Sequence, residues 1–476
     1  MRTTPILSIA RPLLAATAIL ALAACAAQPP RPALRTPLPS GWGNAGGWAR
    51  MASPPPQHAW WRVFGDARLD ALAPQVAAHN AQLAAQLAVY EQARAALRQA
   101  GAALWPTASA TLGATRQKVG ATGNFAGQVG NDVAASAAAS WAPDLWGKVR
   151  LQVRASGDAA RADAATLRGM RLSLQAQLAQ AVLQLHVADA QIVLARRIAD
   201  ADAQSLRLTQ RRFAAGVVTA ADVAAARTLQ LQSRTALTDL QVGRAQLVDA
   251  IAVLVGKPAS NFHLAAEPQL PDVPRVPPGL PSALLQRRPD LIAAAAQVDA
   301  ANAQIGIAER AWFPDLTLGV QGGAQALTAA GLFSAPVLTW SLGPQLAATL
   351  FDGGARAAQL AASRAAYRGS VANYRQAVLV ALQQVEDQLA AQRLLALEQR
   401  QQTAVVGAAE VSLRLAQDQY RAGTAPYLNV LSASNVAAQA RVALLTLQQR
   451  RYVAAVSLVQ ALGGGWGEVS RGAAAH

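Results

Sequence analysis

Histidine and the acidic side chains are the groups that most often bind metals or transfer protons in catalysis. The chain has five histidines, and no two of them stand at metal-ligand spacing: they are His58, His79, His186, His263 and His476. The neighbouring carboxylates Glu386 and Asp387 fall inside a long helical pattern, where solvated or inter-helix roles are more common than catalysis. The sequence therefore predicts no enzyme, no catalytic residue, no metal site and no cofactor. We expect His186 to be an ordinary polar residue on a helix face.

The single cysteine, Cys25, points to covalent lipid chemistry. It follows an apolar run, residues 13 to 24, that is too short to span a bilayer and has signal-peptide dimensions. Its last residues, Leu22-Ala23-Ala24-Cys25, resemble the bacterial lipobox, in which the cysteine becomes the N-terminal residue and carries S-diacylglycerol and N-palmitoyl groups. An ordinary buried cysteine is the alternative, but Cys25 has no partner for an intramolecular disulfide. We expect a signal peptide at 1–24 and an anchor in outer-membrane lipid, because Ala26 rather than aspartate follows the cysteine.

Residues 25–58 are rich in proline, glycine and small side chains, which is typical of a tether. The segment Gly41-Trp42-Gly43-Asn44-Ala45-Gly46 formally matches a dinucleotide-binding pattern, but no strand precedes it and the tether surrounds it. The net charge of +16 comes from singly spread basic residues without interleaved aromatics, so nucleic-acid binding is not expected. The high alanine content favours closely packed helices.

The remainder of the chain is an internal duplication of one sequence unit. Residues 206 to 216 match residues 413 to 423, and this offset of 207 continues without a gap to Gly256 and Gly463. Earlier in each half, Pro106 corresponds to Pro314 at an offset of 208. We therefore expect a first repeat at 59–270, a second at 271–465 and a C-terminal tail at 466–476.

Each repeat reads as a helix, a β-hairpin, a long helix and a shorter helix. The first helices are expected at 67 to 104 and 281 to 312, each ended by a proline. The long and shorter helices are expected at 149 to 213, 355 to 421, 219 to 255 and 427 to 462. Apolar residues in these helices recur every seven positions, which indicates coiled-coil packing.

The two hairpins alternate small or apolar residues with hydroxyl-bearing ones. Their strands are expected at 107 to 112, 133 to 142, 315 to 320 and 338 to 350. The apolar side, which includes Ala110, Leu112, Leu316, Leu318 and Val320, is expected to face lipid, and Thr317 the lumen. Four strands cannot close a barrel, and an open edge is unfavourable in hydrocarbon, so a membrane role requires several chains. Two chains would supply eight strands and three chains twelve, and only the wider barrel leaves a clear lumen.

The duplicated order of hairpins and very long helices resembles the TolC/OprM-type outer-membrane factors, and in particular their NodT-like lipoprotein branch. The resemblance is carried by segments 60–66, 144–150, 280–291 and 350–354. It implies a mainly α fold with membrane β, in which a homotrimer completes a 12-stranded barrel above a coiled-coil periplasmic tunnel. It also implies a passive outer-membrane exit duct for small toxic compounds or drugs, within a tripartite efflux system. Its partners would be a periplasmic adaptor and an inner-membrane pump of the RND or MFS type.

Two alternatives stay open. A type I secretion exit duct would share the architecture, whereas a periplasmic coiled-coil scaffold lipoprotein would have no need of alternating hairpins of membrane-spanning length.

The resemblance also assigns roles to the two helix-to-helix turns, whose glycines permit helix termination in the left-handed conformation. The candidate adaptor-docking residues are Gly216, Val217, Gly423 and Thr424. TolC-like gates carry aspartates just beyond the second turn, where this chain has Asn429 and Ser432, and only Asp222 in the first repeat keeps a carboxylate. Asp222, Asn429 and Ser432 are the candidate periplasmic gate.

Overall fold

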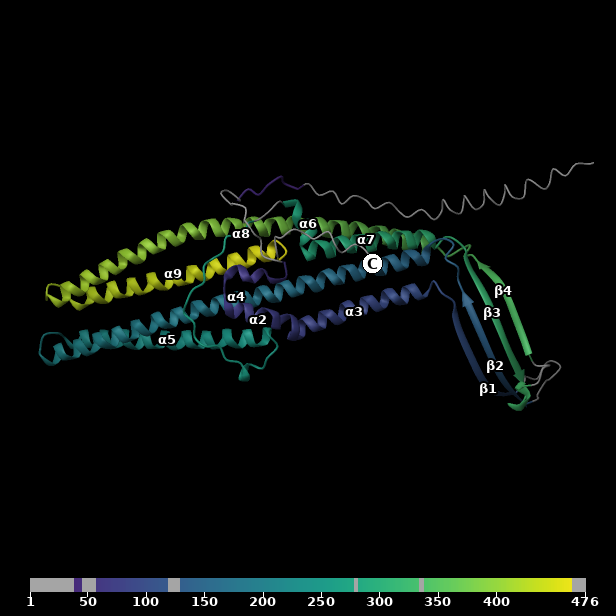
Figure 1. The fold of residues 1–476 in the computed structure, drawn as a ribbon, viewed down its shortest axis with the longest axis horizontal. Helices are drawn as coiled ribbons and strands as arrows, with labels where there is room; N and C mark the ends of the chain where they lie inside the picture. Colours follow the sequence, from purple (N-terminus) through teal and green to yellow (C-terminus); the bar gives the residue numbers. More distant parts are fainter. Residues whose placement is uncertain (1–37, 45–56, 119–128, 278–280, 334–337, 465–476) are drawn as a thin grey trace, which may run out of the picture. The chain divides into compact units, whose positions relative to one another are not determined.

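The computed structural model describes residues 38–44, 57–118, 129–277, 281–333 and 338–464 (Figure 1). They form two compact units. The first unit contains residues 89–164 and 293–375, and the second contains residues 36–88, 165–292 and 376–476, each within the described ranges.

The expected order of helix, hairpin, long helix and shorter helix is confirmed in both repeats (Figure 1). The first repeat contains η2 Gln57–Phe64, α2 Ala67–His79, α3 Ala81–Ala102, β1 Thr107–Lys118, β2 Val129–Trp141, α4 Lys148–Ala214, α5 Ala220–Leu254 and η3 Ala259–Asn261. The second contains η4 Pro281–Ala283, α6 Leu284–Arg287, α7 Pro289–Arg310, β3 Asp315–Ala326, η5 Ala330–Phe333, β4 Leu338–Ala347, α8 Ala355–Arg421 and α9 Tyr427–Ala461. Both long helices have 67 residues, and both helices that follow them have 35.

The helix expected at 67 to 104 is wrong in one respect, because it is broken at Asn80. The side-chain oxygen of Asn80 accepts a hydrogen bond from the backbone N–H of Leu83 at 3.1 Å, so Asn80 caps α3. Its side-chain amide donates to the backbone carbonyl of Leu254 at 2.9 Å, at the end of α5. The expected helix at 281 to 312 is likewise divided into η4, α6 and α7, because Pro289 has no N–H with which to continue α6.

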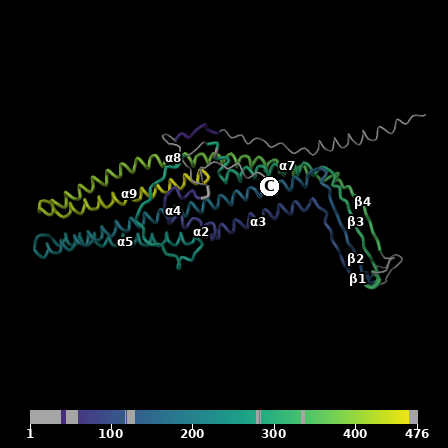
Figure 2. Tube along the Cα trace, viewed as in Figure 1, coloured from purple at the N-terminus to yellow at the C-terminus, as the bar shows by residue number. Residues whose placement is uncertain are grey.

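The four strands form one antiparallel sheet in the order β1-β2-β3-β4 (Figure 2). Strand β2 pairs with β3, so the hairpins of the two repeats share a sheet. Strands β1, β2 and β3 extend further toward their turns than the sequence pattern indicated, and β1 reaches Lys118. Strand β4 begins at Leu338 as expected but ends at Ala347, three residues before the expected end.

The second unit contains a helical core. The helix pairs α4–α5 and α8–α9 lie side by side (Figure 1), joined by ion pairs such as Arg244 with Asp189 and Arg441 with Glu410. The largest fully buried side chains in this unit, besides His186, are Trp60, Leu69, Leu174, Leu178, Leu183, Leu185, Ile251, Leu291, Leu389, Tyr452 and Leu458. Among the described helices, α4 and α9 contain stretches apolar enough to cross a membrane by length and composition. In α4 that stretch is 56% buried, which agrees with helix packing.

Candidate membrane-spanning sheet and helix tips

The register of the sheet separates its side chains into two chemically different faces. Directly opposed residues on neighbouring strands lie on the same face of a sheet. Leu112 opposes Ala135, and Leu318 opposes both Trp141 and Pro344. These pairs belong to one apolar set, which extends along this face up to its hairpin end, where Arg116 opposes Asn131. The set comprises Ala108, Ala110, Leu112, Ala114, Val133, Ala135, Ala137, Ala139, Trp141, Leu316, Leu318, Val320, Gly322, Ala324, Ala326, Leu338, Trp340, Leu342, Pro344 and Leu346. We call this the apolar face; it includes all five residues expected to face lipid.

The opposite side, which we call the polar face, carries hydroxyls, amides and small residues. It comprises Thr107, Ser109, Thr111, Gly113, Thr115, Asp132, Ala134, Ser136, Ala138, Ser140, Asp315, Thr317, Gly319, Gln321, Gly323, Gln325, Thr339, Ser341, Gly343, Gln345 and Ala347. The amide of Gln325 donates to Asp132 across two strands at 3.0 Å. A soluble sheet buries its apolar side against other elements, yet here Trp340 is 82% exposed and Leu342 is 73% exposed within the chain. This division of faces is the pattern of a membrane barrel, with lipid outside and water inside.

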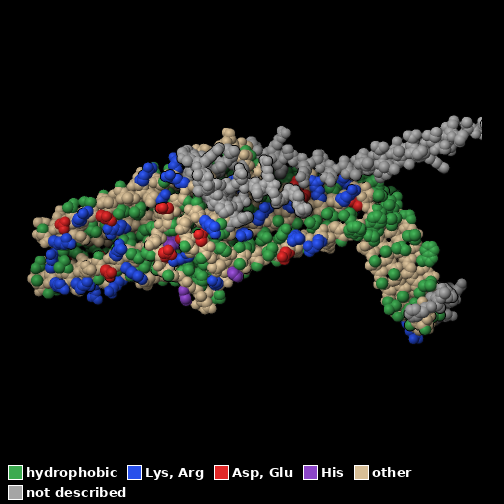
Figure 3. Space-filling model, viewed as in Figure 1, with side chains coloured by type: hydrophobic (Ala, Val, Ile, Leu, Met, Phe, Trp, Pro, Cys, Tyr) green, Lys and Arg blue, Asp and Glu red, His purple; other side chains and the backbone are tan. Residues whose placement is uncertain are grey.

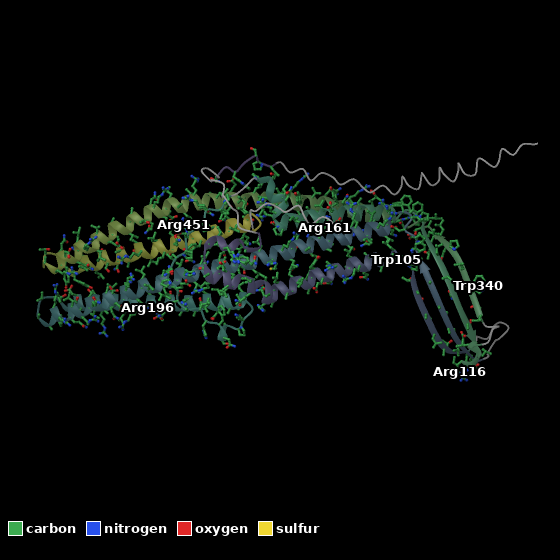
Figure 4. The ribbon with its side chains drawn as sticks, in the orientation of Figure 1. Trp105, Arg116, Arg161, Arg196, Trp340 and Arg451 are labelled. Atoms are coloured by element: carbon green, nitrogen blue, oxygen red, sulfur yellow. The ribbon has the colours of Figure 1, made fainter. Side chains whose placement is uncertain are left out.

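The strands are long enough for that role. They have 12, 13, 12 and 10 residues, and a transmembrane strand needs about 9–11. Figure 3 shows the visible surface of the sheet covered by hydrophobic and uncharged polar atoms, with basic side chains only near its hairpin end. Arg116 lies at that end, and Trp340 lies on β4, one of the two outer strands (Figure 4).

Two edges of the sheet have no partner among the described residues, because β1 and β4 are its outermost strands. Each edge presents a row of backbone N–H and C=O groups. In hydrocarbon an unsatisfied backbone group costs several kcal/mol. The sheet can therefore span a membrane only when both edges pair with strands of other chains.

An aspartate holds each corner where the sheet leads into a long helix. The carboxylate of Asp144 accepts hydrogen bonds from the backbone N–H groups of Val149 and Arg150 at 3.0 and 2.9 Å, which caps the start of α4. Asp352 does the same for α8 and also pairs with Arg356 at 2.5 Å. The aspartate at each corner is thus a helix cap, and both repeats contain it.

Aromatic side chains gather at the same corners. Trp146 stacks on Phe313 with a ring-centroid distance of 5.0 Å, and its indole N–H donates to the carbonyl of Pro314. The guanidinium of Arg356 lies 4.7 Å from the ring centroid of Trp312. The exposed aromatic residues here are Trp105, Trp141, Trp312, Phe313 and Phe351. Tryptophan is enriched where a barrel crosses the membrane–water interface, and this cluster has that composition.

The two helix-to-helix turns have the same backbone, and both are exposed. Gly216 and Gly423 have φ angles of +70° and +74°, in the left-handed region that favours glycine. The next residues donate back across the helix end, from Val217 N–H to Arg212 and from Thr424 N–H to Gln419. All four candidate docking residues are exposed, and Val217 is 69% exposed.

The candidate gate residues lie just after these turns but have different surroundings. The carboxylate of Asp222 accepts from the backbone N–H of Thr219 at 2.9 Å and from its hydroxyl at 2.8 Å, and these bonds lower the pKa of Asp222. Asn429 and Ser432 are exposed, and in the described part of the chain neither side chain contacts Asp222. Asp222 therefore already serves as half of a helix capping box.

A contact between the two helix hairpins, not foreseen from the sequence, lies close to the turns. The hydroxyls of Ser205 on α4 and Tyr427 on α9 are 2.7 Å apart. Tyr427 also packs on Tyr420 with a centroid distance of 5.4 Å, and the guanidinium of Arg212 lies 4.2 Å from the Tyr420 ring centroid. Asp202 is buried on α4 one turn from Ser205, and burial raises its pKa. A duplicated sequence could not reveal this contact, because it joins different positions of the two repeats.

His186 is not the ordinary polar residue expected from the sequence, because it is 2% exposed and contacts a buried carboxylate. Its two ring nitrogens lie 2.6 Å from a carboxylate oxygen of Asp66 and 2.8 Å from the carbonyl oxygen of Glu267. Burial alone would lower the pKa of His186, but both acceptors favour an N–H on each nitrogen, and the net effect raises it. Burial likewise acts to raise the pKa of Asp66, but its bonds from His186 and the Leu69 N–H outweigh this and lower it.

The His186–Asp66 pair belongs to a network that holds the connector between the two repeats. Asp189 accepts from Arg244 at 2.5 Å and from the backbone N–H of Glu267 at 2.7 Å. Arg68 pairs with the Glu267 carboxylate at 2.9 Å. These charges therefore fix a segment of irregular backbone against α4 and α5.

Arg288, in a segment that carries the family resemblance, and Glu386, one of the two neighbouring carboxylates, both have structural roles. Buried Arg288 binds Asp290 through two nitrogens at 3.0 and 2.6 Å and donates to the carbonyl of Ala461 at the end of α9. The carboxylate of Glu386 accepts from the backbone N–H groups of Gly43 and Asn44 at 2.7 and 3.1 Å. Glu386 thus holds the described part of the tether against α8. Cys25, which precedes this part, lies outside the described residues.

Comparisons with known proteins agree with this architecture. A sequence model of the outer membrane efflux protein family matches residues 72–257 and 280–464. The chain is 32% identical to the outer membrane protein OprJ of Pseudomonas aeruginosa over 68% of each chain. It is also 32% identical to the pyoverdine export outer membrane protein OpmQ of the same organism, over 94% of this chain and 96% of that one. The solved structure of the outer-membrane channel OprN matches with a TM-score of 0.83 and 26% identity, over 93% of this chain and 100% of that one.

The chain therefore belongs to the outer membrane efflux protein family. Its fold is that of the TolC-like outer-membrane channels, and it is the outer-membrane channel component of an efflux system.

Proposed function

We propose that three copies of this chain form a passive exit duct of a tripartite efflux system for small toxic compounds or drugs. The sheet carries this proposal, because it has one apolar face, one polar face and two edges without a partner strand in the described part of the chain. Pairing β1 of each copy with β4 of the next closes a barrel of twelve strands, whereas two copies would make eight and fill the interior with side chains. The long helices of three copies then continue as a coiled-coil tunnel in the periplasm.

Lipid at Cys25 would anchor the duct in the outer membrane. The anchor leads into the tether that Glu386 holds at Gly43 and Asn44, so the anchor and the helical body are coupled through a short stretch of chain. Several acyl chains bind a bilayer firmly, whereas one binds only marginally. Cys25→Ala is expected to lose incorporation of radiolabelled palmitate, and label that persists in this variant would contradict the assignment.

The exposed turns at Gly216 with Val217 and Gly423 with Thr424 are the surfaces proposed to dock a periplasmic adaptor. The adaptor would connect the duct to an inner-membrane pump of the RND or MFS type, which would drive transport. Asp222, Asn429 and Ser432 remain the candidate gate at the same end. In this proposal the repeats occupy 59–270 and 271–465, and the chain itself catalyses no reaction.

A type I secretion exit duct is the alternative that the same architecture allows. Relatives of this chain are named for the export of small molecules, as in the case of the pyoverdine exporter, and this favours the efflux role. A purely periplasmic scaffold is disfavoured, because it would expose the whole apolar face to water.

The two faces of strand β3 provide the test. Leu318→Arg places a charge on the apolar face and is expected to cost about 2–4 kcal/mol near mid-bilayer, so surface trimer should fall sharply. Thr317→Arg is the matched control, because the neighbouring residue lies on the polar face and its side chain would reach water. Trimer is measured in outer-membrane fractions by gel electrophoresis without heating. Equal tolerance of both variants would refute the barrel and favour the scaffold.

A further inference from the structure

A buried histidine of α4 holds the connector, which is the segment 262–277 that joins the two repeats without helix or strand. Nδ1 of His186 lies 2.8 Å from the carbonyl oxygen of Glu267 in the connector. Nε2 lies 2.6 Å from a carboxylate oxygen of Asp66 at the start of α2. The side chains of His186 and Asp66 are 2% and 4% exposed, so water cannot readily replace either contact.

Both ring nitrogens of His186 face hydrogen-bond acceptors. A carbonyl oxygen and an ionised carboxylate can only accept, whereas a neutral imidazole has one N–H and one lone pair. Burial acts to raise the pKa of Asp66, but its bonds from His186 and from the Leu69 N–H outweigh this and lower it, so Asp66 is ionised near neutral pH. Only the charged ring, with an N–H on each nitrogen, satisfies both acceptors.

The other charged groups at the connector are already paired. Arg244 on α5 binds Asp189 on α4 at 2.5 Å, and Arg68 on α2 pairs with the Glu267 carboxylate at 2.9 Å. The backbone N–H of Glu267 donates to Asp189 at 2.7 Å. Asp66 forms no ion pair with either guanidinium among the described residues, so the charged ring of His186 is its counter-ion.

The pKa of His186 sets the pH range in which the ring is charged. Burial and the nearby Arg68 act to lower it, but the bonds to Asp66 and Glu267 outweigh both and raise it above its ordinary value of about 6.5. The contribution of the charged ring is therefore fully present below about pH 6.5 and is lost as the pH rises through the raised pKa. Tyr452 of α9, which donates to the connector at Pro271, has a pKa raised by burial and stays neutral in this range.

We propose that His186 is a pH-sensitive clamp, which holds the connector against α4 when the ring is charged and releases it when the ring loses a proton. A neutral ring keeps one N–H, and the charged acceptor Asp66 binds it more strongly than a carbonyl does. Nδ1 then presents a lone pair to the carbonyl oxygen of Glu267, and the repulsion separates the connector from the helix. The clamp lies within a single chain and does not depend on how many copies close the barrel.

Hydrogen exchange of the connector amides tests the clamp. The purified full-length protein in detergent is pulsed with deuterium at values from about pH 5.5 to about pH 9, and the exchange is corrected for its intrinsic pH dependence. Protection of the segment 262–277 is expected to fall roughly tenfold across this range, with the loss occurring above about pH 6.5. Peptides from the middle of α5 serve as the internal reference and should keep their protection.

His186→Gln cannot gain a charge, so its connector should be weakly protected at every pH. His263→Gln is the matched control, because it removes an exposed histidine from the connector itself and should titrate like the unaltered protein. Asp66→Asn keeps the side-chain oxygen that caps α2 but removes the negative charge, so the transition should move toward acid by roughly one pH unit. Connector protection that does not change with pH in the unaltered protein would overturn the proposal, and so would a transition that persists in His186→Gln.

Discussion

The two helix-to-helix turns have the same backbone but are stabilised differently. In each turn, a glycine with positive φ and a hydrogen bond across the last helical turn end the long helix. The residue that starts the following helix differs. Thr219 and Asp222 form a reciprocal capping box at α5, whereas Pro426 precedes α9 without a side-chain cap.

The second turn instead depends on contacts with the first hairpin. Tyr427, the first residue of α9, reaches Ser205 on α4, and the buried cluster around it includes Ala226 of α5. A local cap stabilises a helix end wherever that end lies, whereas a tertiary contact stabilises it only in one position. We therefore expect the second hairpin to shift more readily than the first when the contact with Ser205 is lost.

The two repeats also differ at a pair of equivalent positions away from the turns. Arg244 on α5 forms an ion pair with buried Asp189, whereas the equivalent Arg451 on α9 contacts the amides of Gln399 and Gln448. Burial lowers the pKa of Arg451. At this pair of equivalent positions the first repeat therefore has an ion pair and the second has neutral contacts, although other ion pairs, such as Arg441 with Glu410, join α8 and α9.

The largest expected effect comes from removing what the two turns share. Gly216→Val combined with Gly423→Val forces a β-branched residue into a positive φ, at a cost of about 1–3 kcal/mol per site. Neither position has an atom within 4 Å of an added Cβ, so the cost arises from the backbone and not from a clash. We expect surface trimer to remain and export of a fluorescent dye to be lost in cells that depend on this duct.

Gly243→Val with Gly407→Val is the matched control for that variant. Both glycines lie inside helices, have no positive φ and also have open space around an added Cβ. The control should export normally. Normal export by the turn variant would remove the docking role from both tips.

A smaller effect distinguishes the two turns from each other. Thr219→Ala removes the local cap of α5, and Tyr427→Phe removes only the hydroxyl that contacts Ser205; each should cost about 1 kcal/mol. Amide hydrogen exchange is expected to accelerate about fivefold at the start of α5 in the first variant and at the start of α9 in the second. If Tyr427→Phe left α9 unchanged, the tertiary contact would not hold the second turn.

Periodicity explains which parts of the fold could be predicted. The long helices and hairpins follow from regular patterns that each repeat contains independently, and α8 was found at 355–421 as expected. The helix break at Asn80 could not be predicted from the sequence. An asparagine within a helical pattern becomes a cap only when its amide has a partner such as the carbonyl of Leu254.

The charged contacts also could not be predicted from the sequence pattern. His186 meets Asp66 from a position 120 residues away, and nothing in its own helix distinguishes it from a solvated histidine. The polar and apolar faces of the sheet, by contrast, could be predicted because a strand places alternate residues on opposite faces.

Cross-linking between the two edges of the sheet tests the central claim most directly. Each variant carries one cysteine on β1, at Ser109, Thr111 or Thr115, and a second on β4, at Ser341. Together these variants sample several registers on the polar face. If three copies close one barrel, at least one combination should give bands of one, two and three linked chains and none beyond three. Ladders that stop at two, that continue past three, or that fail in every register would contradict a twelve-stranded barrel made by three chains.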